Sequence, residues 1–333
     1  MELSARIYVA GHCGLVGSAL VRRLRRGGYS NLVVRSHKEL ELTDRQAVRD
    51  FLQKERPEYI FLAAAKVGGI LANSTDPAEF IGQNLMIQTN IIHEGYGIGV
   101  RRLLLLGSSC IYPKYAPQPI KEEYLLTGPL EPTNRPYAVA KIAGIEMCWA
   151  YNRQFGTHFL AAMPTNLFGP GDRYDLHDSH VVPALLRKMH EAKATQAAEV
   201  LIWGSGTPRR AFLYSDDAAD ACVFLMNLPD DALDGIVVQD SMPPIVNVGC
   251  GKEIAIRELA ELIADIVGFK GRLVFDLSKP DGTPRKVLDS SRLAALGWTP
   301  QTPLREGLMR AYRDFSENVA KSARPAVVSS ELP

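Results

Sequence analysis

Two adjoining stretches near the N-terminus decide the fold: Arg6-Ile7-Tyr8-Val9-Ala10 and Gly11-His12-Cys13-Gly14-Leu15-Val16-Gly17. The first is an apolar run of strand length, and the second is a glycine-rich turn that leads into an amphipathic run through Leu20, Val21 and Leu24. A strand, a glycine-rich turn and a helix in this order place the pyrophosphate of a dinucleotide at the helix N-terminus, where backbone amides face it. The stretch therefore predicts a dinucleotide-binding fold.

Each glycine of the turn has a predicted role. Gly11 lets the turn close, Gly14 lets the backbone approach a phosphate, and Gly17 lets the helix pack on its strand. The spacing is GxxGxxG rather than GxGxxG, and a glycine triplet alone also occurs in ordinary turns. Its position directly after a strand favours cofactor binding, with predicted contacts from Gly11, His12, Gly14, Leu15, Val16 and Gly17.

The composition is that of an ordinary globular protein. The chain has 333 residues, of which 46% are hydrophobic, and a formal net charge of +1. This allows one large or two smaller domains and argues against a dedicated nucleic-acid binder. No run of roughly 18 apolar residues and no signal-like start is found, so we expect no membrane span and a cytoplasmic location. The cysteines lack metal-site spacing, so no metal site is expected: Cys13, Cys110, Cys148, Cys222 and Cys250.

Strand and helix patterns alternate through the first half of the chain. Strands are predicted at 31–36, 59–65, 102–109 and 158–166, and helices at 44–55, 77–97 and 136–155. Apolar runs such as Leu103-Leu104-Leu105-Leu106 suit strands covered on both faces, as in a parallel sheet flanked by helices. Because crossovers between parallel strands are right-handed, we expect an α/β fold with a doubly wound parallel sheet of the Rossmann type.

The second half predicts a smaller, partly interleaved α/β domain. Prolines and glycines separate shorter elements there, and a helix is predicted at 256–267. Because Val246-Asn247-Val248-Gly249 resembles another strand of the first sheet, the two halves should interleave. We expect a cofactor domain at 1–170 with a returning segment around 211–250, a mainly substrate-binding domain at 171–320, and a disordered tail at 321–333.

Tyr137 and Lys141 form the first candidate catalytic pair. Four residues apart on a helix, they share one face, so the ammonium can lie near the phenol. A nearby cation favours the phenolate and lowers the pKa of a tyrosine, which makes the side chain a proton donor and acceptor for hydride chemistry on a carbonyl. The pair alone could also arise by chance on a helix. The glycine-rich stretch before it favours the catalytic interpretation.

A polar segment, Gly107-Ser108-Ser109-Cys110, follows the most apolar strand. In open parallel sheets the ligand lies beyond the carboxyl ends of the strands, so Ser108 could donate a hydrogen bond to a substrate carbonyl together with Tyr137. Ser109 is better explained by turn hydrogen bonds. Together, Ser108, Tyr137 and Lys141 resemble the catalytic triad of the short-chain dehydrogenases/reductases, and the length and glycine pattern resemble the extended, nucleotide-sugar branch of that family.

Longer motifs resemble one enzyme group of that branch, the GDP-L-fucose synthases. The similarity runs from about Tyr8 to Trp298 and includes segments 63–69, 107–113, 131–134, 163–166, 203–208 and 279–286. It implies a bifunctional 3,5-epimerase and 4-reductase that acts on GDP-4-keto-6-deoxy-D-mannose with NADPH. It also implies that Lys141 bonds the nicotinamide ribose, and that Leu106, Gly107, Pro164, Asn166, Leu167 and His180 contact the cofactor.

The epimerase activity needs an acid and a base. A ketone at C4 acidifies the hydrogens on C3 and C5, and inversion of those carbons needs a base on one face of the ring and an acid on the other. The resemblance assigns the base to Cys110 and the acid to His180, whose imidazole ordinarily titrates near neutral pH. Without that resemblance, Cys110 would be a packing residue and His180 a solvated or capping residue.

Cofactor choice depends on the residues after the second strand. Val34-Arg35-Ser36-His37 has no acid to hold a ribose hydroxyl, so it favours NADP through a contact between Arg35 and the 2′-phosphate, with His37 beside it. The family, however, usually has Arg where this chain has Cys13 and again where it has His37. Since two phosphate-binding cations are missing, we expect NADP to be preferred with weaker discrimination against NAD than in relatives.

The resemblance also implies a GDP-sugar site at Lys188, Trp203, Arg210 and Asp281. A cation would pair with the diphosphate, the indole would offer a packing face, and the carboxylate would accept hydroxyls. Otherwise Trp203 would be a core residue and Lys188 a solvated one. Asp216 and Asp217 are interpreted as helix-capping residues. The helices at 77–97 and 136–155 fit the dimer interface of extended family members, so a homodimer is expected.

Two alternatives remain at the level of sequence. The same chemistry could act on a related GDP-keto-sugar of the colitose or 6-deoxy-heptose type. The chain could also be a non-catalytic NADP-binding sensor, although the complete set of Ser108, Cys110, Tyr137, Lys141 and His180 argues against that. A plain 4,6-dehydratase is disfavoured because dehydratases carry an acid pair where this chain has Ser109-Cys110.

Overall fold

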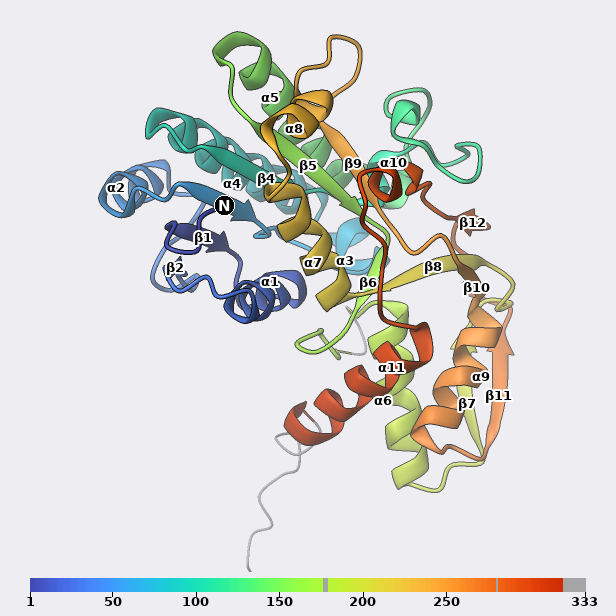
Figure 1. The fold of residues 1–333 in the computed structure, drawn as a ribbon. Coiled ribbons are helices and arrows are strands. Elements are labelled where there is room, and N and C mark those ends of the chain that lie inside the picture. Colours follow the sequence, from blue (N-terminus) through green and yellow to red (C-terminus); the bar gives the residue numbers. More distant parts are fainter. Residues whose placement is uncertain (176–178, 280, 320–333) are drawn as a thin grey trace, which may run out of the picture.

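A six-stranded parallel sheet forms the centre of the first region of the molecule (Figure 1). The computed structural model describes residues 1–175, 179–279 and 281–319. The strand order is β2-β1-β3-β4-β5-β9, with strands at Ile7–Ala10 (β1), Leu32–Val33 (β2), Tyr59–Leu62 (β3), Arg102–Leu106 (β4), Phe159–Pro164 (β5) and Ile245–Val248 (β9). All neighbouring pairs are parallel. The predicted doubly wound Rossmann-type sheet is confirmed.

Helices cover both faces of this sheet. One face packs against α1 (Leu15–Arg26), α7 (Ser215–Met226) and α8 (Asp230–Val237), and the other packs against α2 (Arg45–Glu55), α4 (Pro77–Gly97) and α5 (Arg135–Phe155). Successive strand residues alternate between the two cores: Ile7 and Val9 lie in the first, Tyr8 and Ala10 in the second. This period of two explains why the strands are apolar at every position.

The predicted helices are close to their observed bounds, and the predicted strands are too long. α4 has the predicted ends, and α2 begins one residue late because Asp44 is its N-cap, accepting a hydrogen bond from the amide of Ala47 at 3.0 Å. Strand β3 ends at Leu62 instead of 65, and β2 has two residues instead of six. The small apolar residues 63–65 lie beyond the last paired residue, Leu62, so they form a loop at the carboxyl edge of the sheet.

A second region is built on smaller sheets. Strand β8 (Arg209–Tyr214) pairs in parallel with β6 (Asn166–Phe168) and β12 (Arg285–Lys286) and antiparallel with β10 (Glu253–Ala255). Strands β7 (Glu199–Trp203) and β11 (Arg272–Asp276) form a separate parallel pair. Helices α6 (Val181–Ala194), α9 (Ile256–Val267) and α11 (Leu304–Asp314) enclose the third core. In Figure 1 this region lies at the opposite end from β1 and β2.

The chain returns from the second region to the first. Helix α7 packs on α1, and β9 extends the large sheet beside β5. Two short helices complete the order, α3 (Ile70–Thr75) and α10 (Ser291–Ala295), and α10 packs near β9. This topology supports interleaved halves, while the domain division at about residue 170 stays a prediction. The predicted tail at 321–333 lies outside the described residues. None of the helices within those residues is long and apolar enough to span a membrane.

Candidate active site

The glycine-rich turn has the backbone geometry that its sequence predicts. Gly11 has a positive φ of +83°, and a Cβ at this position would lie 2.6 Å from the amide nitrogen of Ala64. A Cβ at Gly17 would overlap the carbonyl of Gly11, so this glycine lets the helix pack against the turn. A Cβ at Gly14, by contrast, would meet only the carbonyl oxygen of Gly11, at 3.5 Å. The protein itself therefore has room for a Cβ at Gly14, and the close approach of a bound phosphate stays the predicted reason for this glycine.

The N-terminus of α1 fits a negatively charged group. Within the described residues, no side chain caps this end of the helix and no acidic residue lies in its first turn. Its amides are therefore available to oxygen acceptors, and the helix dipole favours an anion there. His12 lies beside it with a buried Nδ1 that has no partner among the described residues, and its Nε2 is 3.3 Å from the Cys13 sulfur. These features fit the pyrophosphate of a dinucleotide.

Ser108 and Cys110 lie just past the carboxyl end of β4. Ser108 is the N-cap of a short 3-10 helix at Ser109–Ile111, and its hydroxyl accepts a hydrogen bond from the Cys110 amide at 3.3 Å. This turn projects the Cys110 thiol, which is half-buried, towards Asn134, whose Nδ2 donates to the sulfur at 3.1 Å. Asn134 precedes α5, so the start of that helix and the end of β4 meet at the thiol.

Tyr137 and Lys141 lie on α5 as predicted. The Lys141 ammonium is buried, 5.9 Å from the centroid of the Tyr137 ring, and donates to the carbonyl of Leu106 at 2.8 Å. Burial lowers the pKa of Lys141 to about 8. Burial and the nearby Cys110 raise the pKa of Tyr137, against a hydrogen bond with Ser108 that lowers it. The net shift for Tyr137 is opposite to the one that the lysine pair alone predicts, because burial is the larger effect.

His180 has a different environment. It is the N-cap residue of α6, with an exposed side chain, although partial desolvation by the surrounding protein lowers the pKa of its imidazole. In the described parts of the chain no hydrogen bond joins it to Cys110 or Tyr137, and residues 176–178, which precede it, lie outside those parts. The structure thus brings together Ser108, Cys110, Tyr137 and Lys141, and the convergence of His180 on them stays a prediction.

The predicted GDP-sugar residues form a group in the second region. Trp203 on β7 is 62% exposed, and its ring lies 5.6 Å from the Lys188 ammonium. Asp281 accepts hydrogen bonds from the Ser205 amide and hydroxyl at 2.9 and 2.7 Å, so its carboxylate holds the turn beside Trp203. Burial lowers the pKa of Arg210, and the carboxylate of Asp281 opposes that shift. An exposed indole face flanked by cations suits a purine attached to phosphates.

A match to a protein-family model identifies the family of this chain. The model, described as "NAD dependent epimerase/dehydratase family", matches residues 7–249. The chain belongs to this family. It is 58% identical over 321 residues to "Putative GDP-L-fucose synthase 2" of Arabidopsis thaliana, which covers 96% of this chain and 94% of the relative.

Solved structures agree with that assignment. A GDP-6-OMe-4-keto-L-xylo-heptose reductase from C. jejuni has a TM-score of 0.89 and 38% identity, covering 95% of this chain and 99% of that one. A GDP-L-fucose synthetase from Naegleria fowleri bound to NADP has a TM-score of 0.84 and 28% identity, covering 98% of each. The predicted resemblance to GDP-L-fucose synthases is confirmed, as are the predictions of an enzyme and of a nicotinamide cofactor.

Other predicted cofactor residues of this epimerase/dehydratase chain lie in two settings. Leu106 ends β4 and Gly107 follows it, and Pro164, Asn166 and Leu167 lie where β5 passes into β6, so both groups occupy the carboxyl edge of the sheet. The residues predicted to bind the 2′-phosphate, Arg35 and His37, lie beside carboxylates of the protein itself. The Arg35 guanidinium donates to Glu55 and to the Val34 carbonyl, each at 2.7 Å. His37 is exposed and lies 3.2 Å from Glu41.

Three residues near these sites were not assigned from the sequence. Asn134 contacts the Cys110 thiol, the Lys286 ammonium lies 3.6 Å from the same sulfur, and the Lys279 ammonium lies 5.4 Å from the Trp203 ring. All three residues fall in segments 131–134 and 279–286, which resemble the family. Their position in these motifs was the one feature of the sequence that could have indicated a role in the site. We define the thiol cluster as the side chains around the Cys110 sulfur: Ser108, Cys110, Asn134, Tyr137 and Lys286.

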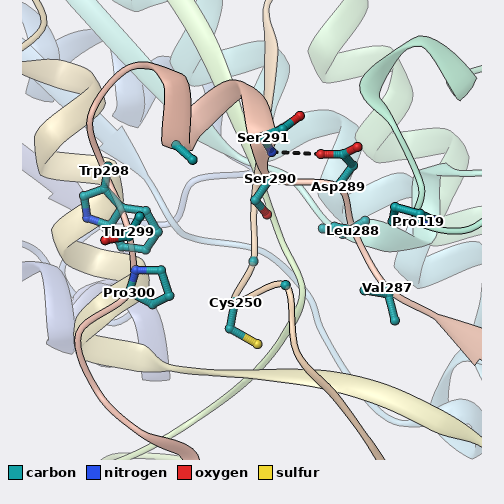
Figure 2. A pocket seen from close by; sticks show the side chains of 13 residues that line it. Pro119, Cys250, Val287, Leu288, Asp289, Ser290, Ser291, Trp298, Thr299 and Pro300 are labelled. Carbon is teal, nitrogen blue, oxygen red and sulfur yellow. Dashed lines mark hydrogen bonds between the residues drawn. The ribbon is translucent and has the colours of Figure 1, made fainter.

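A cavity of about 320 Å³ lies elsewhere in this family member, beyond the end of β9. Figure 2 shows its wall, with Trp298 and Pro300 facing Leu288 and Asp289. The Cys250 thiol in this wall donates to the carbonyl of Phe212 at 3.3 Å. None of the predicted catalytic side chains lines this cavity; donors and ionisable groups converge instead in the thiol cluster.

Proposed function

We propose that this chain converts GDP-4-keto-6-deoxy-D-mannose to GDP-L-fucose, by epimerisation at C3 and C5 followed by NADPH-dependent reduction at C4. The observation that carries the proposal is the convergence of Ser108, Cys110, Tyr137 and Lys141 at one edge of the sheet, beside an open helix N-terminus. A ketone reductase needs only the serine, tyrosine and lysine. The thiol beside them supplies the additional group that carbon inversion requires.

Cys110 acts as the base in epimerisation. Its thiolate takes the proton from C3 or C5, the carbon–hydrogen bond breaks, and the electron pair moves onto the C4 oxygen as an enolate. Ser108 and Tyr137, which are hydrogen-bonded to each other, face the oxygen and stabilise its charge. His180 then returns a proton to the opposite face of the carbon. Solvent takes the proton from the thiol and recharges the imidazole before the second inversion.

Reduction uses the same oxygen site. NADPH, when bound, supplies a hydride to C4. Tyr137 donates its proton to the C4 oxygen, and because burial raises its pKa, the phenol is protonated at neutral pH, as a proton donor must be. Lys141, whose pKa of about 8 leaves it mostly charged at neutral pH, stabilises the phenolate that remains and has donors free for a ribose hydroxyl.

NADP is the proposed cofactor, with weak discrimination against NAD. A structural relative from Naegleria fowleri binds NADP, and residues 34–37, directly after β2, contain no acid. Arg35, however, is engaged by Glu55, and Cys13 and His37 stand where relatives usually have arginine. Equal or higher catalytic efficiency with NADH than with NADPH would overturn this preference.

We propose a GDP-sugar site around Trp203 and a homodimer in the cytoplasm. The sugar nucleotide would contact Lys188, Trp203, Arg210 and Asp281, with the guanine against the indole. The dimer is supported by exposed apolar side chains on α4 and α5, the two helices that pack against each other: Met86, Tyr96, Val139 and Phe155. Sedimentation of the purified protein as a monomer at micromolar concentration would contradict the dimer.

A related heptose substrate is the second candidate, because a solved relative is a heptose reductase. Its 38% identity is well below the 58% shared with a GDP-L-fucose synthase, so the 6-deoxy-hexose is favoured. A non-catalytic sensor would not need the complete set of Ser108, Cys110, Tyr137 and Lys141.

The test is incubation of the protein with GDP-4-keto-6-deoxy-D-mannose and NADPH in heavy water. We expect loss of nicotinamide absorbance, GDP-L-fucose as product, and deuterium at C3 and C5. The Cys110→Ser variant should lose most of the deuterium uptake while it retains oxidation of GDP-L-fucose by NADP⁺. No change in absorbance would exclude the reductase, and unchanged deuterium uptake in the variant would exclude Cys110 as the base.

A further inference from the structure

We propose that Lys286 is a positioning residue that stabilises the thiolate of Cys110 and thereby prepares it as the base for epimerisation. This inference rests on the proposed function, since it assigns a second residue to the same thiol. It gives a role to a side chain in segment 279–286 that neither the triad nor the nucleotide site explains.

The geometry places a cation directly beside the thiol. The Lys286 ammonium lies 3.6 Å from the Cys110 sulfur, and both side chains are partly buried. In the part of the chain that the structure describes, the sulfur is the one hydrogen-bonding or ion-pairing partner of this ammonium. A lysine that is partly withdrawn from water without a carboxylate partner is expected to have an anionic partner in the working enzyme.

Within the part of the chain that the structure describes, the other side chains that contact Cys110 supply no competing cation. Asn134, before α5, donates a neutral amide hydrogen to the sulfur, and Ser108, on the same turn, accepts from the Cys110 amide. Among the described residues at the thiol, Tyr137 on α5 is the other titratable group, and its pKa is raised chiefly by burial and further by a charge on Cys110. At neutral pH this phenol is uncharged, so Lys286 on β12 supplies the positive charge at the thiol.

The chemistry requires such a charge. An ordinary thiol, with a pKa near 8.5, is only a few per cent ionised at neutral pH, and the thiolate is the form that accepts a proton. A cation at contact distance favours the thiolate, as do amide donors. Asn134 and Lys286 thus provide complementary stabilisation, one by a hydrogen bond and the other by charge.

The deciding experiment measures the reactivity of Cys110 without substrate. The full-length holoenzyme and its Lys286→Met and Lys286→Arg variants are treated with iodoacetamide between pH 6 and pH 10, and alkylation of Cys110 is quantified by mass spectrometry. We expect Lys286→Met to slow alkylation at neutral pH about tenfold and to move the midpoint of its pH profile about one unit higher, since one pH unit is a tenfold change in thiolate fraction. Lys286→Arg should remain close to the unaltered protein.

Controls separate this role from others. Lys54→Met removes an exposed lysine of α2 and should change nothing, and far-ultraviolet circular dichroism with a thermal melt reports on folding. If Lys286→Met is unfolded, Lys286→Gln is used in its place. Deuterium uptake at C3 and C5 should fall in parallel with the rate of Cys110 alkylation in the Lys286→Met variant.

Two outcomes would overturn the inference. Unchanged alkylation with a raised KM for the GDP-sugar would make Lys286 a diphosphate ligand, and equal losses in the Met and Arg variants would leave it a packing residue. Failure of the proposed function is distinguishable, since it would appear as unchanged deuterium uptake in Cys110→Ser whatever the alkylation profile.

Discussion

Under the proposed function, the glycine-rich turn and the thiol cluster are the cofactor half and the substrate half of one site, and they are built in different ways. The turn is built from seven consecutive residues, 11–17, whose backbone conformation creates the site. The thiol cluster joins side chains from the ends of β4 and β12 and the start of α5, which are up to 176 residues apart. A site built from consecutive backbone groups can be predicted from the spacing of residues in the sequence. A site assembled from distant side chains can be located only once the fold is known. Substitutions can test each half separately.

The largest effect is expected inside the thiol cluster, from Tyr137→Phe. Loss of the phenolic proton should reduce the rate of ketone reduction by roughly 10²–10⁴-fold, the usual contribution of a general acid. Single-turnover measurements with the keto-sugar and NADPH would detect it. Deuterium uptake should fall less, because Ser108 still holds the enolate oxygen. A decrease in reduction smaller than tenfold would mean that another group supplies the proton.

The next effect separates two glycines within the turn. Gly17→Ala places a Cβ against the Gly11 carbonyl and should lower the free energy of unfolding by about 3 kcal/mol. Gly14→Ala, the matched control, has an extended backbone and 3.5 Å of clearance, so it should cost less than about 1 kcal/mol. It should nevertheless weaken NADPH binding roughly tenfold or more, about 1.4 kcal/mol.

Urea denaturation and cofactor titration would measure both variants. If Gly14→Ala bound NADPH with unchanged affinity, the glycines of the turn would be needed for folding and not for cofactor binding. The comparison between a backbone-built and a side-chain-built half of the site would then fail.

The third prediction concerns the pH dependence that Lys141 imposes on stability. Burial lowers its pKa from 10.5 to about 8, so between these values the unfolded chain binds more protons than the folded one. The burial penalty is complete below about pH 8 and is relieved as the pH rises towards 10.5, which is worth on the order of 3 kcal/mol. The unaltered protein should therefore gain stability relative to Lys141→Met between pH 8 and pH 10. Denaturation curves that stay parallel would contradict the prediction.

The smallest effect is expected at the edge of the cofactor site. Glu55→Gln weakens the ion pair that holds Arg35 and should raise the preference for NADPH over NADH about threefold, in line with a partly exposed ion pair of under about 1 kcal/mol. The ratio of the two kcat/KM values measures it, with Glu58→Gln, which loosens a different pair to Arg101, as the control. An unchanged ratio would show that Arg35 does not reach the 2′-phosphate.

The sequence was sufficient to predict those features that depend on residues close together in the chain. Pro77 at the first turn marks the start of α4, and the Tyr137–Lys141 spacing places both residues on one face of α5. The strand ends were missed because Ala63-Ala64-Ala65 is as apolar as a strand, whereas β3 ends where both neighbouring strands stop pairing with it. Propensity does not carry that information.

The assembled contacts had no local signal. Nothing in the segment around Arg35 indicates that Glu55, twenty residues later, will hold its guanidinium. In the same way, nothing around Cys110 indicates that an ammonium from β12 will reach its sulfur. The burial of the Tyr137 side chain could not be predicted from the sequence either, and this burial reverses the expected direction of the pKa shift of Tyr137. Such features follow from the way the elements pack.

The pairing of β12 with β8 sets Lys286 opposite Arg210, and adjacent strands are about 4.8 Å apart. Under the proposed function, the hydrogen bonds between β12 and β8 fix the spacing between Lys286, at the reacting sugar, and Arg210, at the nucleotide. Under the same proposal, a keto-sugar without its nucleotide would lose the contact at Arg210 and its alignment with the thiol, so the nucleotide would position the sugar for reaction as well as strengthen binding.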